Sequence, residues 1–419
     1  MTGLKNAQSD ENDTMKVLFI HPNFPAQFRF LAAALGANPD NYVIYVTQNP
    51  RPEWHINGVA KAVFTADDKT VSDKPLSQAL KTPLAMGEAV LNLCRKLKKS
   101  GFEPDVVYGH SGWGSSWFVK DVFPEARHLS YLEWYYNPDG ADMRFDRRQP
   151  LTPERAANLR IKNTPILNDL TVCDLGVTPT KWQRDQFPEL FHHKIVQLFD
   201  GVDTDVFKPN PEAKLKLPGL DLSDAPRIIT YASRGMEPYR GFPQFMEALP
   251  YILAADTECH FVIVASERVC YGPPPALGQS YKKLMLEKIR LSQSDRERVH
   301  FVGALPYGPY RQVLQASDVH IYLTRPFVLS WSMIEAMACG CLVVASDTEP
   351  VREVIIDGVN GFLVDFFTPK AIAERVLGVL NYPSFMTQIR ANARQTILER
   401  YALKKVLPKH LEIIGNMKA

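Results

Sequence analysis

The fold is decided by the stretch Val319-His-Ile-Tyr-Leu-Thr-Arg-Pro-Phe-Val-Leu-Ser-Trp-Ser-Met-Ile-Glu-Ala-Met-Ala-Cys-Gly-Cys-Leu-Val-Val-Ala345. It begins and ends with short apolar runs, at 319–323 and 341–345, which are typical of buried strands. Between them, a loop leads into a helix that the spacing predicts near 331–338. A strand, a helix and a strand in this order favour parallel pairing, because parallel strands need a crossover connection.

The same alternation extends outward over both halves of the chain. In the first half, strands are expected at 16–20, 42–47, 105–109, 126–132 and 172–178, and helices at 26–35 and 76–99. In the second half, further strands are expected at 227–232, 260–265 and 299–303, and further helices at 243–254, 309–316 and 369–380. This pattern predicts an α/β protein with two doubly wound, Rossmann-like domains.

The length of 419 residues suits two domains better than one. We expect a disordered extension at 1–14, a first domain at 15–200, a turn-rich linker at 201–211 and a second domain at 212–400. A C-terminal helix at about 401–419 is expected to pack back on the first domain. Ligands of such sheets bind at the carboxyl ends of the strands, so a cleft between two facing domains is the expected site.

Composition excludes some classes of protein. Lys and Arg total 48 while Asp and Glu total 46, and this balance gives no argument for a nucleic-acid partner. The six cysteines lack the spacing of a zinc site, which favours reduced thiols in the cytoplasm. The sequence shows neither a signal peptide nor an apolar run of the ~18 residues that a membrane span needs. We therefore expect a soluble cytoplasmic protein.

The phosphate-binding motifs of common cofactors are absent from the sequence. Neither half carries a glycine-rich dinucleotide fingerprint or a Walker A loop, and residues 21–29, after the first strand, contain no glycine. An NAD-dependent oxidoreductase is thus disfavoured, and no cofactor is expected. Asp203-Thr-Asp205 resembles a metal-binding acidic pair, but its position after Gly-Val favours a linker turn, and no metal is expected.

The loop at 328–332 is the expected phosphate site. Backbone N–H groups and the dipole at the start of a helix near Trp331 favour phosphate oxygens, and the small Ser330 and Ser332 leave room for a diphosphate. Glu335 lies one turn into this helix, where its carboxylate would accept hydrogen bonds from ribose hydroxyls. The structural alternative is a capping box, Ser-x-x-Glu, formed by Ser332 and Glu335.

Several motifs resemble those of family 4 glycosyltransferases. They are Ile334-Glu-Ala-Met-Ala-Cys-Gly340, Leu342-Val-Val-Ala-Ser346, Asp357-Gly-Val-Asn-Gly-Phe-Leu-Val364, Leu198-Phe-Asp-Gly-Val-Asp203 and Tyr231-Ala-Ser-Arg-Gly-Met-Glu-Pro-Tyr-Arg-Gly241. The resemblance covers about 16–394 and is most specific in the second half. It implies the GT-B fold, in which two Rossmann-like domains face each other across a cleft and the second holds most of the donor. It also implies metal-independent transfer with retention of configuration.

The resemblance assigns roles to single residues. Arg234 and Arg240 match the cations that bind the donor diphosphate. His110, which follows a first-domain strand, matches a histidine that contacts the donor sugar near the reacting carbon. Glu335 matches the second glutamate of a Glu-x7-Glu pattern whose first position is Phe327 here. A phenyl ring accepts no hydrogen bonds from sugar hydroxyls. This predicts either a donor with an apolar group or hydroxyl contacts to the amides of Val328 and Leu329. The alternatives are that Phe327 turns into the core of the second domain with a shifted loop, or that the loss of the glutamate has ended catalysis.

Acceptor contacts are expected from the first domain. Asn23, Phe24 and Glu133 follow strands there and are candidates for an acceptor groove, with packing in the core as their alternative. The basic run at 95–99 is either a weak peripheral contact with anionic lipids or a solvated helix end.

Together with these residues, the resemblance to family 4 glycosyltransferases implies a hexosyltransferase that uses a nucleotide-sugar donor and a glycan, lipid-linked or other hydroxyl acceptor, as in polysaccharide biosynthesis. Two alternatives stay open. One is a catalytically silent protein that binds a sugar nucleotide or a glycan, and the other is a GT-B sugar-nucleotide epimerase.

Overall fold

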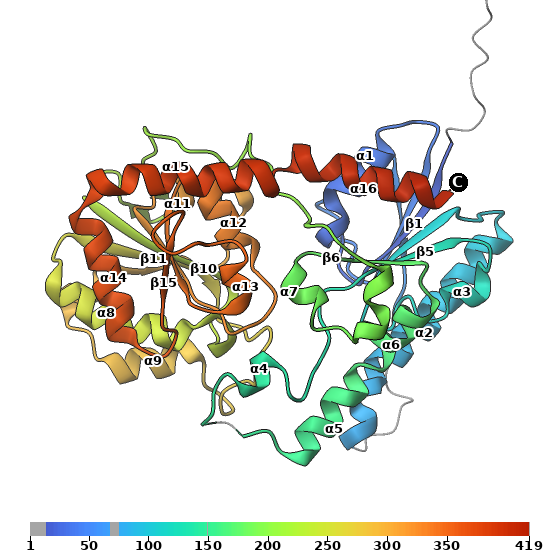
Figure 1. Cartoon of the computed structure of the whole chain (residues 1–419), viewed down its shortest axis with the longest axis horizontal. Helices are drawn as coiled ribbons and strands as arrows, with labels where there is room; N and C mark the ends of the chain where they lie inside the picture. Colours follow the sequence, from blue (N-terminus) through green and yellow to red (C-terminus); the bar gives the residue numbers. More distant parts are fainter. Residues whose placement is uncertain (1–13, 68–74, 149, 419) are drawn as a thin grey trace, which may run out of the picture. The chain divides into compact units, whose positions relative to one another are not determined.

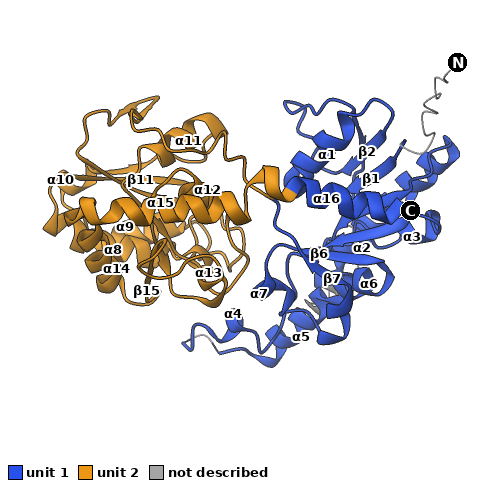
Figure 2. Cartoon of the chain, turned by 45° about the horizontal axis from the view of Figure 1, so that its top comes forward, with its two compact units in different colours: residues 1–200, 407–419 blue, residues 201–406 orange. Residues whose placement is uncertain are grey.

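The computed structural model describes residues 14–67, 75–148 and 150–418, so the extension expected at 1–14 lies almost wholly outside the described residues. The chain forms two compact units (Figure 2). Unit 1 comprises residues 1–200 and 407–419, and unit 2 comprises residues 201–406. The segment 201–211, which the sequence suggested as a separate linker, belongs to unit 2.

Unit 1 is built on a parallel sheet with helices on its faces (Figure 1). The strand order is β3-β2-β1-β4-β5-β6-β7. The strands are β1 (Lys16–Ile20), β2 (Tyr42–Thr47), β3 (Val59–Val63), β4 (Val106–His110), β5 (Arg127–Tyr131), β6 (Leu175–Thr178) and β7 (Ile195–Gln197). The helices include α1 (Arg29–Gly36), α2 (Pro75–Lys99), α3 (Val119–Val122), α4 (Ala141–Arg144), α5 (Pro153–Lys162), α6 (Thr164–Val172) and α7 (Lys181–Arg184). The C-terminal helix α16 (Leu403–Lys418) belongs to unit 1 from residue 407 onward, as the sequence analysis expected for a C-terminal helix.

The core of unit 1 explains why its central strands were visible in the sequence. Leu18 of β1 and Val107 of β4 are buried in one cluster with Val90 and Cys94 from α2. A strand that is covered on both faces is apolar throughout, and such runs are recognised easily. The outer strands β3 and β7 were not predicted. At the sheet edge, Val59-Ala-Lys-Ala-Val63 buries only its first residue fully, so its composition is mixed.

Unit 2 contains a second parallel sheet, with the strand order β12-β11-β10-β13-β14-β15. The strands are β10 (Arg227–Gly235), β11 (Cys259–Ser266), β12 (Val299–Phe301), β13 (Val319–Tyr322), β14 (Leu342–Ser346) and β15 (Phe362–Val364), beside an antiparallel pair, β8 (Lys216–Leu217) and β9 (Leu220–Asp221). The helices include α8 (Phe242–Ala255), α9 (Tyr281–Ile289), α10 (Gln293–Arg296), α11 (Tyr307–Gln315), α12 (Trp331–Ala338), α13 (Glu349–Arg352), α14 (Pro369–Asn381) and α15 (Pro383–Arg400).

Each sheet has one point at which the chain reverses the direction of strand addition. In unit 1 this switch point lies between β1 and β4, and in unit 2 it lies between β10 and β13. The loops that leave such strands at their carboxyl ends diverge to opposite faces and open a crevice, where ligands of α/β sheets bind. Ligand-binding residues are therefore expected just after β1, β4, β10 and β13.

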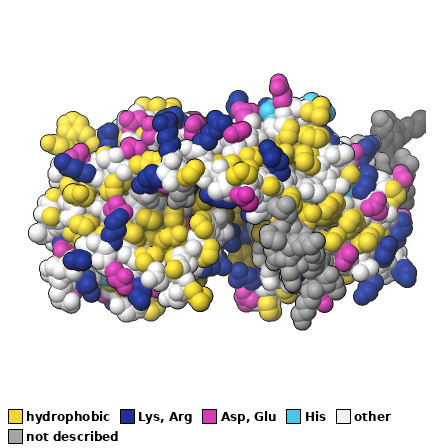
Figure 3. Space-filling view, turned by 90° about the horizontal axis from the view of Figure 1, so that it is seen from below, with side chains coloured by type: hydrophobic (Ala, Val, Ile, Leu, Met, Phe, Trp, Pro, Cys, Tyr) yellow, Lys and Arg dark blue, Asp and Glu magenta, His cyan; other side chains and the backbone are white. Residues whose placement is uncertain are grey.

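Three further observations concern membrane-spanning helices and charged side chains. Among the described residues, no helix is long and apolar enough to cross a membrane. On the face shown in Figure 3, basic and acidic side chains are interspersed rather than gathered into one basic area. In the basic end of α2, Lys98 donates a hydrogen bond of 2.8 Å to the carbonyl of Val122, so part of this run fastens α2 to α3.

Buried histidines predict how stability changes with pH. Burial lowers the pKa of His320, on β13, from its ordinary value of 6.5 to about 3. The ring stays neutral in the fold but binds a proton below pH 6.5 in the unfolded chain. The contribution of the neutral His320 ring to the stability of the fold is therefore complete above pH 6.5 and is lost as the pH falls toward 3. Between pH 6.5 and 5, we expect a loss of about 2 kcal/mol from this residue.

The test compares His320→Asn with wild type by urea unfolding at several pH values. Asparagine can keep the contact that Nδ1 of His320 makes with Oγ1 of Thr230 at 2.9 Å. The variant should lose less stability than wild type on acidification, since it lacks the titrating ring. Parallel pH profiles for the two proteins would show that His320 does not titrate in this way.

Candidate functional site

Arg240 lies at the switch point of unit 2. After β10, the chain forms a short 3-10 helix, Pro238–Arg240, and then α8 begins at Phe242. Gly241 joins them with a φ of +63°, and a Cβ atom there would lie 2.3 Å from the Cβ of Leu323. Only glycine therefore allows this turn to pack against the end of β13, and the turn brings Arg240 to the crevice.

The Arg240 guanidinium is 4% exposed and ties β10 to the loop that follows β13. Its Nη1 donates to the Thr324 hydroxyl at 2.9 Å, to the Val328 carbonyl at 2.8 Å and to the Tyr322 hydroxyl at 3.3 Å. Burial acts to lower the pKa of Arg240, but Tyr322, Tyr271 and Glu237 raise it above its ordinary value, so the cation is kept. Arg240 thus orders the loop and places a positive charge beside it.

The second predicted cation, Arg234, has a different setting. It is the second-last residue of strand β10, directly before Gly235, and its side chain is exposed. Its backbone carbonyl accepts a hydrogen bond of 2.6 Å from the hydroxyl of Ser266, on β11. Arg234 is therefore the more accessible of the two arginines, whereas Arg240 is enclosed by protein.

The predicted phosphate loop ends at a capped helix. Ser330 is the N-cap of α12, and its hydroxyl accepts from the backbone N–H of Ser332 at 3.3 Å. The backbone N–H of Ser330 itself donates to the Tyr322 hydroxyl at 2.8 Å. The capping-box alternative, with Ser332 as the cap, is wrong, because the helix begins two residues earlier. Trp331 and Ser332 therefore occupy the first turn of α12, where backbone N–H groups favour anions.

Glu335 faces α11 from the second turn of α12. Its carboxylate is buried and accepts a hydrogen bond of 3.0 Å from the hydroxyl of Tyr310. Burial, and next the Glu335 carboxylate, raises the pKa of Tyr310 well above its ordinary value, so this phenol keeps its proton and donates. The glutamate that was predicted to bind ribose is thereby held in one orientation by Tyr310.

Phe327 belongs to an aromatic cluster with Tyr239 and Tyr271. Its ring is 9% exposed, and its centroid lies 5.3 Å from that of Tyr239 and 5.1 Å from that of Tyr271, both in edge-on arrangements. The Arg240 guanidinium carbon lies 5.7 Å from the centre of the Phe327 ring. Phe327 is thus packed within the carboxyl edge of the sheet, next to the enclosed cation, and Val328 and Leu329 follow it in the same loop.

In unit 1, two histidines meet at the switch point. His110 is the last residue of β4, and His21 directly follows β1. Their ring centroids are 4.7 Å apart, and both side chains are buried. His110 was predicted from the sequence, whereas His21 was not. The signal was available, because a polar residue after each of two adjacent parallel strands reaches the same edge of the sheet.

The hydrogen bonds of His110 direct one ring nitrogen toward Glu133. Nδ1 accepts from Nε1 of Trp113 at 3.1 Å and lies 2.9 Å from the Ser111 carbonyl, two contacts that need opposite protonation of this nitrogen. Nε2 is buried without a hydrogen-bond partner and lies 3.6 Å from the nearer carboxylate oxygen of Glu133. When Nδ1 accepts from Trp113, the proton of a neutral ring lies on Nε2, on the side of Glu133. When Nδ1 instead donates to the Ser111 carbonyl, Nε2 faces Glu133 with a lone pair.

The three candidates for the acceptor groove, Asn23, Phe24 and Glu133, lie in different surroundings. Glu133 also accepts a hydrogen bond of 3.2 Å from Gln27, so it lies at the His110 site. The Asn23 amide oxygen accepts from Asn49 at 2.9 Å. Phe24 is buried edge-on against Tyr45 at 4.8 Å between ring centroids, which is the core packing that was its alternative.

Asp169 supports the loop that follows His110 and was not predicted. This buried carboxylate, on α6, accepts from the hydroxyls of Ser111 at 2.8 Å and Ser116 at 3.0 Å. Burial raises its pKa to about 6, despite these hydrogen bonds. Asp169 therefore fixes the backbone that carries Trp113. Its hydrogen-bond partners lie more than 50 residues away in the chain, so no local sequence pattern predicts this role of Asp169.

The acidic pair at 203–205 forms a turn, as the sequence suggested. One carboxylate oxygen of Asp203 accepts from the backbone N–H of Asp205 at 3.0 Å and of Val206 at 3.1 Å. Over the part of the chain that the structure describes, no group of three or more His, Cys, Asp or Glu side chains could hold a metal ion.

Comparison with known proteins fits this arrangement. The chain matches the glycosyl transferase family 4 group over residues 39–207 and the glycosyl transferases group 1 over residues 218–396. The two matches occupy most of the two units, and each unit carries one parallel sheet with helices around it, as the GT-B fold has. The chain therefore belongs to the family 4 glycosyltransferases, as the sequence motifs predicted.

Individual relatives are distant. An uncharacterized glycosyltransferase of Methanocaldococcus jannaschii is 29% identical over 120 residues, which cover 28% of this chain and 31% of the relative. A D-inositol 3-phosphate glycosyltransferase of Thermobispora bispora is 22% identical over 53% of this chain and 51% of the relative. The chain thus spans about a third to a half of these relatives. The crystal structure of Anabaena HepE in complex with UDP-glucose has a TM-score of 0.69 and 18% identity, covering 96% of this chain and 100% of HepE.

Proposed function

We propose that this protein transfers a sugar from a nucleotide diphosphate sugar to a hydroxyl of a glycan, lipid-linked or other acceptor, with retention of configuration and without a metal ion. The observation that carries the proposal is the switch point of unit 2, where Arg240 meets the loop leading to the N-terminus of α12. Such a combination of fixed positive charge and backbone N–H groups suits a diphosphate. A nucleotide-sugar donor is also supported by HepE, which was crystallised with UDP-glucose.

The proposed mechanism divides the work between the two units. In unit 2, Arg234, Arg240 and the first turn of α12 stabilise the charge that develops on the leaving diphosphate, which is usually the largest contribution to transfer chemistry. Glu335 accepts from the ribose hydroxyls. In unit 1, His110 contacts the donor sugar near the reacting carbon, and Glu133 binds hydroxyls of the acceptor. The acceptor oxygen forms the new bond to the anomeric carbon as the bond to the diphosphate breaks, and its proton leaves with the diphosphate.

The first test is nucleotide binding by Arg234→Ala. Because this side chain is exposed, its removal should leave the fold intact, as thermal unfolding would verify. Loss of one charged hydrogen bond should weaken binding of the preferred nucleotide diphosphate by at least about tenfold. Calorimetry with UDP, GDP and ADP measures this. Lys282, which forms an ion pair with Glu267 at the surface, offers a matched control, and Lys282→Ala should bind like wild type. Equal affinity of the Arg234 variant would refute the assignment.

A second prediction concerns metals. Positive charge at the diphosphate comes from arginines in this proposal, so turnover should persist in excess EDTA. Product formation, followed by mass spectrometry with and without chelator, is the measurement. If EDTA abolishes turnover and magnesium or manganese restores it, the arginines do not suffice and a cation takes part.

A catalytically silent binding protein is the alternative, and Phe327 is the observation that favours it, because this residue replaces a carboxylate expected to hold the donor sugar. A panel of UDP-, GDP- and ADP-sugars, analysed by mass spectrometry with candidate acceptors, separates the two functions. Transfer supports the proposal, and binding without turnover supports the silent protein. An isomerised donor would instead identify a sugar-nucleotide epimerase.

A further inference from the structure

A buried carboxylate outside the predicted site clamps a loop beside it. Glu237 is 0% exposed and lies between β10 and Arg240. Its two oxygens accept hydrogen bonds from three successive backbone N–H groups, those of Cys270 at 3.1 Å, Tyr271 at 2.8 Å and Gly272 at 2.9 Å. Burying a carboxylate is costly unless it is well bonded. Here all of the bonding falls on one short loop, at the carboxyl edge of the sheet.

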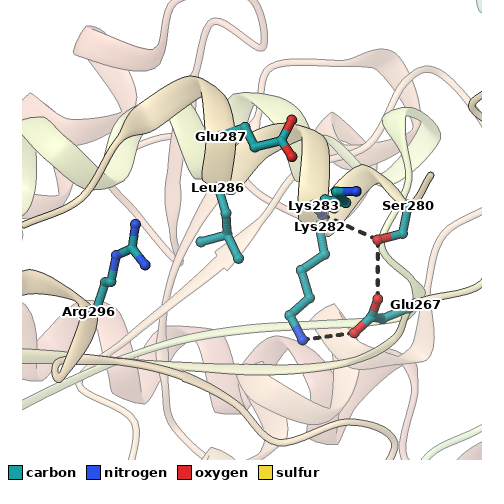
Figure 4. Close-up of a pocket in the computed structure, with 7 residues that line it drawn as sticks. All are labelled: Glu267, Ser280, Lys282, Lys283, Leu286, Glu287 and Arg296. Atoms are coloured by element: carbon teal, nitrogen blue, oxygen red, sulfur yellow. Dashed lines mark hydrogen bonds and ion pairs between the residues drawn. The ribbon is translucent and has the colours of Figure 1, made fainter. Parts of the chain in front are cut away.

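The same loop, residues 267–280 after β11, is fastened at its base. Figure 4 shows Glu267 accepting from the hydroxyl of Ser280 at 3.1 Å and from the Lys282 ammonium at 2.8 Å. The Tyr281 hydroxyl donates to the Pro273 carbonyl at 3.0 Å. The backbone also passes close to β10, because a Cβ atom on Gly235 would lie 2.2 Å from the Arg268 carbonyl oxygen. The loop is therefore held at its base and along its middle.

The hydrogen bonds from the backbone of 270–272 to Glu237 fix the position of the Tyr271 side chain. This half-buried ring contacts Phe327 edge-on at 5.1 Å between centroids, and the Arg240 guanidinium carbon lies 5.2 Å from its centre. On the other side, a Cβ atom on Gly272 would lie 3.3 Å from the ring of Tyr239. Of the two rings beside the Arg240 guanidinium, Tyr271 is thus the more accessible, because it is half-buried and Phe327 is only 9% exposed.

The direction of the loop at 327–335 indicates which part of a donor Tyr271 would meet. With ribose at Glu335 and the diphosphate at the start of α12, as the proposed function has them, the donor sugar extends toward the Phe327 end of the loop. Aromatic rings there offer a flat apolar face for the C–H groups of a sugar ring.

We propose that Glu237 is a positioning residue for donor recognition, which holds Tyr271 as the accessible aromatic wall of the sugar subsite. This inference rests on the proposed function and deepens it. Glu237 acts through the backbone of 270–272 and touches no substrate. The recognised group is the apolar face of the sugar in a nucleotide diphosphate sugar.

The experiment measures two affinities for each protein by calorimetry, one for a nucleotide sugar and one for the matching nucleotide diphosphate. UDP-, GDP- and ADP-glucose are tried first on wild type, and the pair that binds best is used. Glu237→Gln turns an amide N–H₂ toward one backbone N–H and should weaken the nucleotide sugar about tenfold or more. The nucleotide diphosphate should change by less than about threefold, since Tyr271 contacts only the sugar in this proposal.

Three further variants complete the test. Tyr271→Ala should reproduce the selective loss, whereas Tyr271→Phe, which keeps the ring, should restore most of the sugar affinity. Glu267→Gln is the matched control, because it removes a carboxylate from the same loop but acts at the exposed base, and it should stay within about twofold of wild type. Hydrogen exchange of the amides of 270–272 should speed up in Glu237→Gln and not in Glu267→Gln.

The outcomes are distinct. A selective loss of sugar affinity in Glu237→Gln and Tyr271→Ala supports the inference. Faster exchange at 270–272 with unchanged sugar affinity overturns it, and so does an equal loss of sugar and diphosphate affinity. If wild type binds none of the three glucose donors and also fails to bind UDP-N-acetylglucosamine, the proposed function itself fails and the inference falls with it, before any variant is compared.

Discussion

Replacing His110 by alanine should lower kcat by roughly 100-fold or more, while the affinity for UDP or GDP stays within about twofold of wild type. His110 ends β4 in unit 1, whereas the residues assigned to the diphosphate belong to unit 2. The ring is 3% exposed, and its one unpartnered nitrogen points toward Glu133 at 3.6 Å. In the proposed function, His110 therefore acts on the reacting end of the donor, and the residues of unit 2 act on its diphosphate.

The controls for His110→Ala separate chemistry from packing. His128 is another buried histidine, on β5 of the same unit, and His128→Asn should lose stability but keep kcat. His110→Asn retains an acceptor for Trp113 in place of Nδ1 and lacks Nε2. If this variant folds well and stays slow, the Nε2 side of the ring is what turnover requires. An unchanged kcat in a folded His110→Ala would make His110 structural.

Single elements show which parts of the fold could be predicted from the sequence and which could not. The central strands β1, β4, β10 and β13 were predicted because strands buried on both faces are mostly apolar, with only single polar residues such as His320 between. The short edge strand β15, Phe362–Val364, was missed because three residues carry no periodicity. The family motifs added what periodicity lacks, namely the roles of Arg234, Arg240 and Phe327.

The missed site residues share one cause. The Glu237 carboxylate is positioned by hydrogen bonds from backbone N–H groups that lie 33 to 35 residues away in the sequence. The Asp169 carboxylate is positioned by hydrogen bonds from hydroxyls that lie 53 and 58 residues away. Side chains of this kind carry no local pattern, because their partners are chosen by the packing of the whole unit. The capping box at Ser332 failed for a related reason. The Tyr322 hydroxyl, on β13, binds the Ser330 backbone and fixes the start of α12 earlier than the local pattern suggested.

The last prediction is that Phe327→Glu changes the choice of donor. Phe327 is only 9% exposed, so it meets a sugar with the edge of its ring, next to Tyr271. That edge leaves a sugar hydroxyl unpaired, at about 1–3 kcal/mol each, but packs well on a deoxy carbon, a methyl or an acetamido group. We therefore expect wild type to favour a donor with such a group. In the variant, the carboxylate enters beside the Arg240 guanidinium, now 5.7 Å from the phenyl centre, and can accept from hydroxyls. The ratio of kcat/KM for UDP-N-acetylglucosamine to that for UDP-glucose should fall by roughly 30-fold.

Competition assays with both donors in one reaction measure this ratio directly. Phe327→Leu is the matched control, because it keeps an apolar side chain without adding a charge, and it should preserve the wild-type preference. The aromatic contacts to Tyr239 and Tyr271 make some loss of stability expected in both variants, so the ratio of donors is more informative than either rate. Identical preferences in wild type and Phe327→Glu would refute the apolar wall. Absence of wild-type turnover with a verified acceptor would point to the silent protein, since the carboxylate that the family uses at this position would then be the missing catalytic requirement.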